Sequence, residues 1–193
     1  MLFEEVKHFI LNKIQQELPQ NLSYHSLEHV KDVYSSAEAL AVLEQVGGEE
    51  LQLLLTAVLF HDTGFLRDQK EHEKVGCEIA REYLPTYGYT PGQIEKICGM
   101  IIATKIPQQP KTHLEMIICD ADLDYLGRED FFVIGKKLFD ELCMYGIISS
   151  ESEWNKLQKR FLESHTYFTE SAKKLRLARK EEHIAIVTSK IHD

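Results

Sequence analysis

The chain contains 193 residues, 44% of them hydrophobic and 27% charged, which is ordinary for one folded domain and excludes a disordered or collagen-like chain. It has 22 Lys and Arg residues against 31 Asp and Glu residues, and the net charge of -9 disfavours a nucleic-acid polymer or an anionic membrane as a partner. Small phosphorylated molecules remain candidate ligands, because a metal ion or a local basic pocket can hold them.

The first part of the chain predicts three helices separated by clear breaks. An amphipathic pattern over Val6–Ile14 predicts the first helix, which stops before Pro19. The second begins near Ser23, a suitable N-cap residue, and runs to the break at Gly47–Gly48. The third, over about 49–61, is apolar on all sides, as expected of a helix at the centre of a bundle.

The rest of the chain predicts further helices, over 71–84, from 91, from 113, over 131–145, and from 151 to 191 with a break near 165–169. Thr90 before Pro91 marks one helix start, and Thr112 with Glu115 forms a capping box at another. No segment shows the sustained apolar–polar alternation of a strand. The fold class is therefore predicted as all-α, a single-domain helical bundle.

The cysteines and the N-terminus bear on the compartment. No two of the four cysteines form a CxxC pair, which is typical of free thiols in a reducing environment: they are Cys77, Cys98, Cys119 and Cys143. No apolar run approaches the roughly 20 residues of a spanning helix. Acidic residues follow Phe3, so the start of the chain resembles neither a signal peptide nor a transit peptide. We expect a cytoplasmic protein without a membrane partner, whereas the oligomeric state is left open.

Nine histidines are the first candidates for chemistry. Five stand alone among polar residues and are expected on the surface: His8, His113, His165, His183 and His192. His25 and His29 stand four residues apart on the second predicted helix, so both are expected on one face. Either both imidazoles reach a metal, or one reaches a metal and the other a substrate. An ordinary surface pair is the alternative.

The pair His61–Asp62 is a sharper feature, because it ends the most apolar helix of the chain. Burying ionisable groups is costly unless they are paired or bind a metal. A divalent cation would hold both side chains inward. The alternative is a helix end that dips into solvent, with Asp62 capping the following turn.

A third feature is the acidic segment Asp120-Ala-Asp122-Leu-Asp124, which follows a buried stretch. Its spacing resembles the start of a calcium loop. That loop needs Gly at position six and Glu at position twelve, where this chain has Tyr125 and Phe131. On a helix Asp120 and Asp124 would share a face while Asp122 points elsewhere, so at most one or two of the three acids enter a single site.

Together, His29, His61, Asp62 and one acid of this segment form a mixed imidazole–carboxylate set. Such ligands suit iron, manganese, cobalt, nickel or zinc, and they suit the activation of water. Other catalytic motifs are absent: there is no Walker A, GxGxxG or GxSxG segment, and His72–Glu73 lies in HExxG rather than HExxH.

Three segments carry a family resemblance: Tyr24–Val30, Ala57–Gly64 and Cys119–Gly127. In this order they resemble the motifs of the HD superfamily of metal-dependent phosphohydrolases, and in particular its small stand-alone members. The similarity covers about residues 20–130. It implies one HD-type domain over 1–193, with the C-terminal helices of 150–191 packed on the motif core.

The resemblance also implies the metal ligands, which are His29, His61, Asp62 and Asp122. Asp122 is chosen because the last ligand of the family lies in an x-Ala-Asp segment. Family members with two metals add histidines from the middle helices. His72 stands where one of them could fall, but the second place holds Thr104 and Lys105. We therefore expect one firmly bound metal, and a second ion, such as magnesium, only with the substrate.

The implied activity is hydrolysis of a phosphate ester or anhydride in a nucleotide or small phosphorylated metabolite. Asp62 would hold both the metal and the attacking water, and His25 would protonate the leaving oxygen. Lys105 would offset phosphate charge, and Arg67 and Arg128 are further candidates for this role. The alternative for these three cations is an ordinary solvated side chain.

Two other functions compete with hydrolysis. A di-iron oxygenase would need a complete second iron site, which Thr104 argues against. A non-catalytic ligand-binding or signalling module would be indicated by the loss of a metal ligand, and none of the implied ligands is missing from the sequence.

Overall fold

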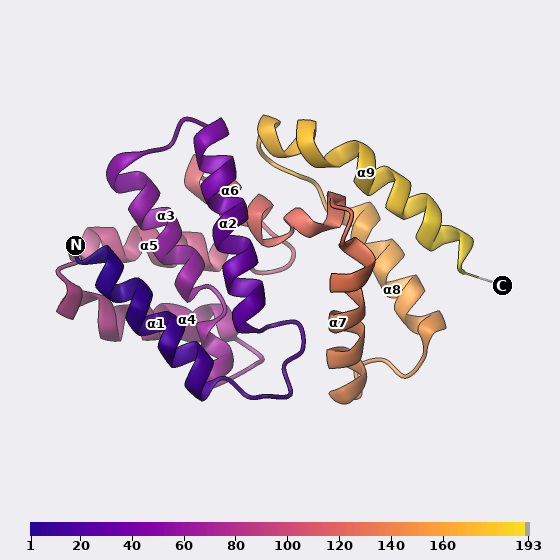
Figure 1. The fold of residues 1–193 in the computed structure, drawn as a ribbon, viewed down its shortest axis with the longest axis horizontal. Helices are drawn as coiled ribbons and strands as arrows, with labels where there is room; N and C mark the ends of the chain where they lie inside the picture. Colours follow the sequence, from indigo (N-terminus) through magenta and orange to yellow (C-terminus); the bar gives the residue numbers. More distant parts are fainter. Residues whose placement is uncertain (192–193) are drawn as a thin grey trace.

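A computed structural model describes residues 1–191 (Figure 1). Its α-helices are α1 (Phe3–Glu17), α2 (Leu27–Leu43), α3 (Gly48–Phe60), α4 (His72–Tyr83), α5 (Pro91–Ala103), α6 (His113–Asp122), α7 (Phe131–Met144), α8 (Glu151–Ser164) and α9 (Glu170–Ser189). Three 3-10 helices join them: η1 (Thr63–Leu66), η2 (Leu84–Tyr87) and η3 (Asp124–Gly127). Residues 1–191 contain no strand, so the predicted all-α bundle is confirmed. None of the helices in this range is long and apolar enough to cross a membrane.

Helix α3 lies at the centre of the larger apolar core, as its composition predicts. Every residue from Leu53 to Phe60 is buried. The helix packs against α1, α2, α5 and α6, which present their own apolar faces to it. Burial on all sides removes about 1.5–3 kcal/mol of unfavourable hydration for each large apolar side chain. The C-terminal end of α3, where His61 follows, is therefore held in the interior.

The start of α2 differs from the prediction. The helix begins at Leu27, and its N-cap is Ser26, whose side chain accepts a hydrogen bond from the His29 amide. The predicted start near Ser23 is wrong, because a serine three residues later makes the capping bond. His25 therefore precedes the helix, and the expectation that His25 and His29 share one helical face is also wrong.

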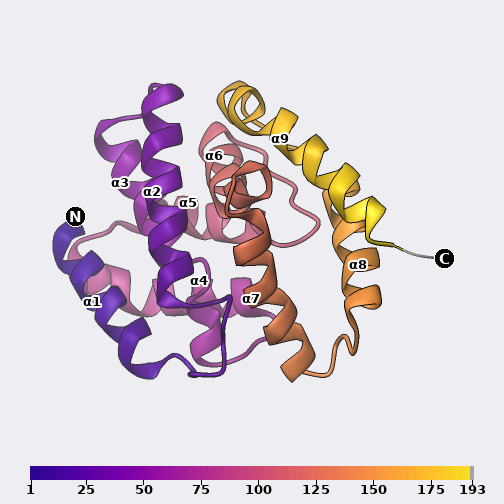
Figure 2. The same ribbon diagram turned by 45° about the vertical axis from the view of Figure 1, so that its right-hand side comes forward.

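The last three helices form a second, smaller apolar core beside the first. Its buried members are Tyr24, Leu123, Tyr125, Leu126, Phe131, Leu162 and Val187. Figures 1 and 2 show α7, α8 and α9 on one side of the molecule, with α7 facing the segment between α1 and α2. Tyr24 joins this core from the N-terminal part of the chain. The segment containing His25 thus lies between the two cores.

Gly64 allows η1 to approach the start of α4. A Cβ atom placed on Gly64 would lie 1.9 Å from the backbone oxygen of His72, far inside any real contact. Because the neighbouring atoms belong to backbone, they cannot move aside as a flexible side chain would. The absence of a side chain at Gly64 therefore fixes how closely His72 approaches His61 and Asp62.

We expect Gly64→Ala to destabilise the protein, because the added methyl group forces η1 and α4 apart. Overpacking of this kind costs roughly 1–3 kcal/mol, which for a domain of this size lowers Tm by several degrees. Gly92→Ala is the matched control, since its Cβ would meet nothing within 4 Å. Thermal unfolding of both variants checks this, and equal Tm values would contradict the proposed steric role of Gly64.

Candidate metal centre

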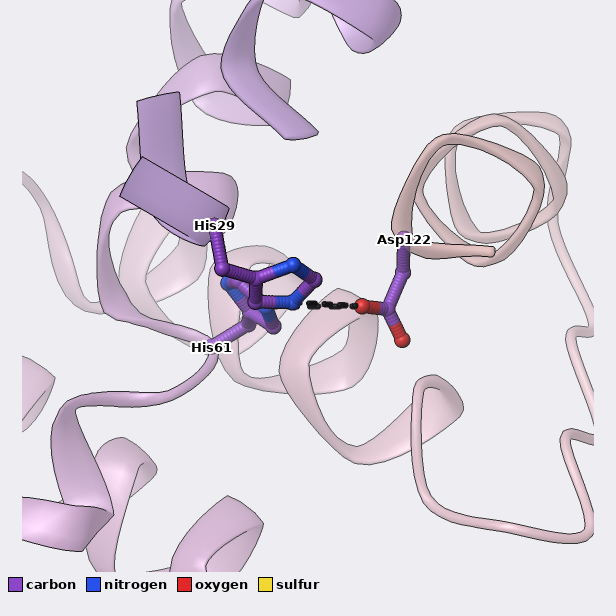
Figure 3. A group of neighbouring side chains, drawn as sticks. All are labelled: His29, His61 and Asp122. Carbon is purple, nitrogen blue, oxygen red and sulfur yellow. Dashed lines mark ion pairs between the residues drawn. The ribbon is translucent and has the colours of Figure 1, made fainter. Parts of the chain in front are cut away.

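Three helices bring four potential ligands together. His29 lies in the first turn of α2, His61 and Asp62 directly follow α3, and Asp122 is the last residue of α6. In Figure 3 the carboxylate of Asp122 faces the two imidazoles across the gap between the helices. One ligand atom from each of His29, His61 and Asp122 lies within 4.8 Å of the other two.

The separations fit donors around one ion. His29 Nε2 lies 3.2 Å from Asp122 Oδ1, and His61 Nε2 lies 3.6 Å from the same oxygen. Asp62 Oδ2 lies 3.3 Å from His61 Nε2 and 3.5 Å from His29 Nε2. Two imidazole nitrogens and two carboxylate oxygens therefore surround one point, the donor set that suits a divalent transition metal.

Within residues 1–191, two of these atoms are buried without a hydrogen-bond partner: His61 Nε2 and Asp62 Oδ2. A buried polar atom without a partner costs roughly 1–3 kcal/mol. The other ring nitrogen of His61, Nδ1, lies 2.7 Å from the backbone oxygen of Val58. A carbonyl only accepts, so Nδ1 carries a proton, and the lone pair of a neutral ring lies on Nε2. His61 is thus oriented as a metal ligand, and a cation would satisfy both unpartnered atoms.

The charges of the cluster also favour a bound positive charge. Burial raises the pKa of both carboxyls, but the neighbouring histidines outweigh it, so that the pKa of Asp62 is lowered and that of Asp122 falls to about 2. Burial lowers the pKa of His61, but Asp62 and Asp122 raise it well above its usual range. The cluster therefore favours a positive charge between nitrogen and oxygen, supplied by a proton or by a bound cation.

The three acids of the 120–124 segment have separate contacts. Both oxygens of Asp120 accept hydrogen bonds at the start of α9, from Phe168 N at 2.7 Å and Thr169 N at 2.8 Å. Asp124 accepts two hydrogen bonds from Arg176, at 2.6 and 3.0 Å. Of the three, Asp122 alone lies in the candidate metal centre.

A cavity of about 360 Å³ adjoins the cluster. Its polar and charged lining includes His25, His29, Asp62, Lys70, His72, Glu73, Thr104, Lys105 and Asp122, and its apolar lining includes Ile106, Leu123, Leu138 and Phe161. The cavity therefore brings His25 and Lys105, both named from the sequence, beside the candidate metal ligands. Lys70 and Glu73 were not singled out in the sequence.

The two arginines named from the sequence do not line this cavity. Arg67 donates a hydrogen bond of 2.7 Å to Glu82 on the surface. Arg128 forms ion pairs with Asp130 at 2.6 Å and Asp32 at 2.8 Å. The structure therefore does not place either arginine as a substrate contact in this cavity, because nearby carboxylates bind both guanidinium groups outside it.

His72 lies at the edge of the cluster. Its Nε2 atom is 3.8 Å from Asp62 Oδ1 and 3.3 Å from Glu73 Oε1. The Thr104 hydroxyl donates to the Ile101 carbonyl at 2.8 Å, so its hydrogen is engaged within its own helix end. A second ion would thus find His72, Glu73 and the outer oxygen of Asp62, but no further imidazole from the position of Thr104.

Phe65 packs against two histidines that line the cavity. Its ring stacks on His25 with centroids 4.2 Å apart and on His72 with centroids 4.3 Å apart. The side-chain carboxylate of Glu141, on α7, contacts both the backbone amide and the ring of His25. Burial lowers the pKa of His25, but Glu141 and the carboxylates of the cluster outweigh this and raise it. Neither Phe65 as a partner of His25 nor Glu141 could be found from sequence spacing.

Two of the five histidines expected on the surface are buried, which corrects that prediction. His183 donates from Nδ1 to the Leu126 carbonyl, 2.9 Å away, and its ring stacks on Phe131. His165 packs beside Lys180, and burial together with this cation lowers the pKa of His165 to about 3. His8 and His113 are exposed, and His192 lies outside the described residues.

The all-α bundle and the imidazole–carboxylate cluster between its helices place the protein among helical proteins with a candidate metal centre. The model of the HD domain family matches residues 23–124, more than half of the chain. The protein therefore belongs to the HD domain family, which confirms the resemblance carried by the three motifs. The matched range contains all four clustered residues and ends before α7. No curated protein sequence matches this chain.

Solved structures share the fold over nearly the whole chain. A predicted HD superfamily hydrolase from an uncultured Thermotogales bacterium has a TM-score of 0.64 and 22% identity, covering 95% of this chain and 90% of its own. A protein from Lactobacillus plantarum has a TM-score of 0.69 and 19% identity, covering 98% of both chains. Bacillus subtilis YpgQ in complex with ADP has a TM-score of 0.66 and 16% identity, covering 98% of this chain and 95% of its own.

We expect Asp122→Ala to weaken metal binding strongly, because it removes a donor that would contact the ion directly. The loss of affinity should exceed the roughly 10–100-fold that removal of an outer partner typically costs. Asp120→Asn is the matched control, two residues away: it should keep its metal and instead lower Tm, because Asp120 holds the start of α9. Metal content by mass spectrometry checks both, and the reverse pattern would make Asp120 the ligand.

Proposed function

We propose that this protein is a metal-dependent phosphohydrolase that acts on a nucleotide or a small phosphorylated metabolite. The observation that carries the proposal is the cluster of His29, His61 and Asp122, with Asp62 beside it, next to a cavity lined by Lys70 and Lys105. Membership of the HD domain family supports a hydrolase. The ADP bound to YpgQ, which has the same fold, favours a nucleotide over other phosphorylated molecules.

His29, His61, Asp62 and Asp122 would hold the cation, which we expect to be iron, manganese, cobalt, nickel or zinc. A divalent cation in such a site lowers the pKa of a coordinated water toward about 7, so that hydroxide becomes available at neutral pH. Asp62 has one oxygen toward the imidazoles and the other toward His72, so it can hold an ion and a water at once. Magnesium accompanying the substrate would meet His72 and Glu73.

The remaining residues of the cavity have roles that follow from their chemistry. The water oxygen forms a bond to phosphorus, the bond to the leaving oxygen breaks, and that oxygen must receive a proton. His25 lines the cavity, and although burial lowers the pKa of its ring, Glu141 and the carboxylates of the cluster raise it, so His25 is suited to supply this proton. Lys105 offsets the negative charge of the phosphate, and Ile106 and Phe161 provide apolar surface for the rest of a small substrate. A polymer of nucleic acid is not expected as a substrate, given the acidic chain.

The cytoplasm remains the predicted compartment. Cys77, Cys98, Cys119 and Cys143 are free thiols, and the first three of them are buried. Free buried thiols are typical of proteins in a reducing environment.

Metal analysis joined to a phosphate-release screen tests the function. We expect about one tightly bound transition metal per chain, since the Thr104 position offers no imidazole for a second. Nucleotides and sugar phosphates should release phosphate or pyrophosphate only with metal present, and a chelator should abolish the release. Two tightly bound irons per chain with an oxygen-dependent reaction would favour the oxygenase instead. Metal binding without any turnover would favour a non-catalytic module.

His25→Ala and Lys105→Ala should have different kinetic effects. Loss of a general acid lowers kcat by about 10²-fold or more, so His25→Ala should reduce kcat and keep its metal. Lys105→Ala should raise KM more than it lowers metal content, because its charge acts on phosphate. Steady-state kinetics with metal analysis separates the two. Loss of metal in His25→Ala would make His25 a ligand rather than an acid.

A further inference from the structure

Glu141 is a buried carboxylate that none of the roles above requires. Only 3% of the residue is exposed, although it lies on α7, beyond the range matched by the HD family. A buried carboxylate is costly unless its oxygens are satisfied. Among the described residues, His25 is the sole ionisable partner within salt-bridge distance of Glu141. The reason for burying this charge must therefore lie at His25.

Every hydrogen bond of the Glu141 side chain is made to one short segment. Its Oε2 atom accepts from the backbone amides of Tyr24 at 2.8 Å and His25 at 3.1 Å. Its Oε1 atom contacts Nδ1 of the His25 ring. One side chain thus holds both the backbone and the ring of a residue 116 positions away in the sequence.

The His25 ring needs such a partner because no helix holds it. His25 precedes the Ser26 N-cap of α2, so its backbone lacks helical hydrogen bonds. Phe65 stacks on the ring, which limits its tilt but does not select between the two orientations that a flip of the ring about χ2 exchanges. A carboxylate only accepts hydrogen bonds, so Glu141 places a proton on Nδ1. Nε2 is then the nitrogen left to face the cavity that His25 lines.

We propose that Glu141 is a positioning residue that orients His25 for proton donation to the leaving oxygen. This inference rests on the proposed phosphohydrolase function. In the step, the bond from phosphorus to the leaving oxygen breaks and its electron pair stays on that oxygen. The oxygen takes the proton from Nε2 of the charged ring. The ring becomes neutral and keeps the proton on Nδ1, which remains hydrogen-bonded to the Glu141 carboxylate. Helix α7 thereby completes a site whose candidate metal ligands all come from the N-terminal part of the chain.

Glu141→Gln separates this role from simple structural support. The amide oxygen of Gln can still accept from the backbone of Tyr24 and His25, so the segment stays in place. The amide NH₂ group then meets the Nδ1 proton of the charged His25 ring donor to donor, so the form that donates the proton loses its orienting bond. Asp140→Asn is the matched control, since Asp140 is the neighbouring residue on α7 and its partner is Lys136 on the surface.

Kinetics with two kinds of leaving group is the first measurement. Glu141→Gln should keep its metal and its Tm, and it should lower kcat by about 10–100-fold for a nucleotide or alkyl phosphate, within the range that general acid catalysis contributes. An aryl phosphate with a strongly acidic phenol needs little protonation, so its kcat should fall much less. KM should change little. Equal losses for both substrates, or loss of metal, would assign Glu141 a purely structural role and overturn the inference.

The second measurement does not need activity. In protein with ¹⁵N-labelled histidine, the ring nitrogens of His25 are assigned by comparison with His25→Ala. Nδ1 should carry a hydrogen-bonded proton in the unchanged protein and in Asp140→Asn, and this signal should be lost or shifted in Glu141→Gln. An unchanged spectrum would overturn the inference. The expected spectra together with no turnover of any phosphate substrate would refute the proposed function but keep Glu141 as the residue that orients His25.

Discussion

The structure depends on placing two carboxylates beside two imidazoles, while no lysine or arginine among residues 1–191 lies within salt-bridge distance of these carboxylates. Asp62 and Asp122 face His29 and His61 at 3.2–3.6 Å, and two of the atoms involved have no hydrogen-bond partner. Such a cluster is stable only when a positive charge lies between its nitrogens and oxygens. A proton can supply this charge, but a divalent cation satisfies all four donors at once. The helices therefore hold four donor groups in an arrangement that needs a positive charge at its centre, and a bound metal ion would supply that charge.

Most of the architecture could be predicted from local patterns. The uniformly apolar segment that becomes α3 predicts a central helix, and the capping residues Thr90 and Thr112 mark the starts of α5 and α6. The start of α2 could not be predicted, because Ser23 and Ser26 are equivalent as candidate caps and only Ser26 makes the bond in the fold. His165 and His183 have polar neighbours in the sequence, yet helix packing buries both.

The candidate site shows a similar division. His29, His61 and Asp62 stand out because ionisable residues border apolar helices, and the structure brings them together with Asp122. Contacts between distant segments carry no such signal: nothing in the sequence links Glu141 to His25, or Arg128 to Asp32. The positions of Arg67 and Arg128 could not be predicted for the same reason, since packing decides whether the guanidinium group faces a cavity or a nearby carboxylate.

The acidic segment at the end of α6 joins the two halves of the molecule. Its middle acid, Asp122, faces the candidate metal centre, while Asp120 fixes the start of α9 and Asp124 binds Arg176 within α9. Two acids on either side of Asp122 therefore connect the end of α6 to α9. The solved relatives share the fold over at least 95% of this chain, although the HD match ends at residue 124. The C-terminal helices thus support the site, because α9 contacts the residues two positions before and after Asp122, and Glu141 of α7 contacts His25.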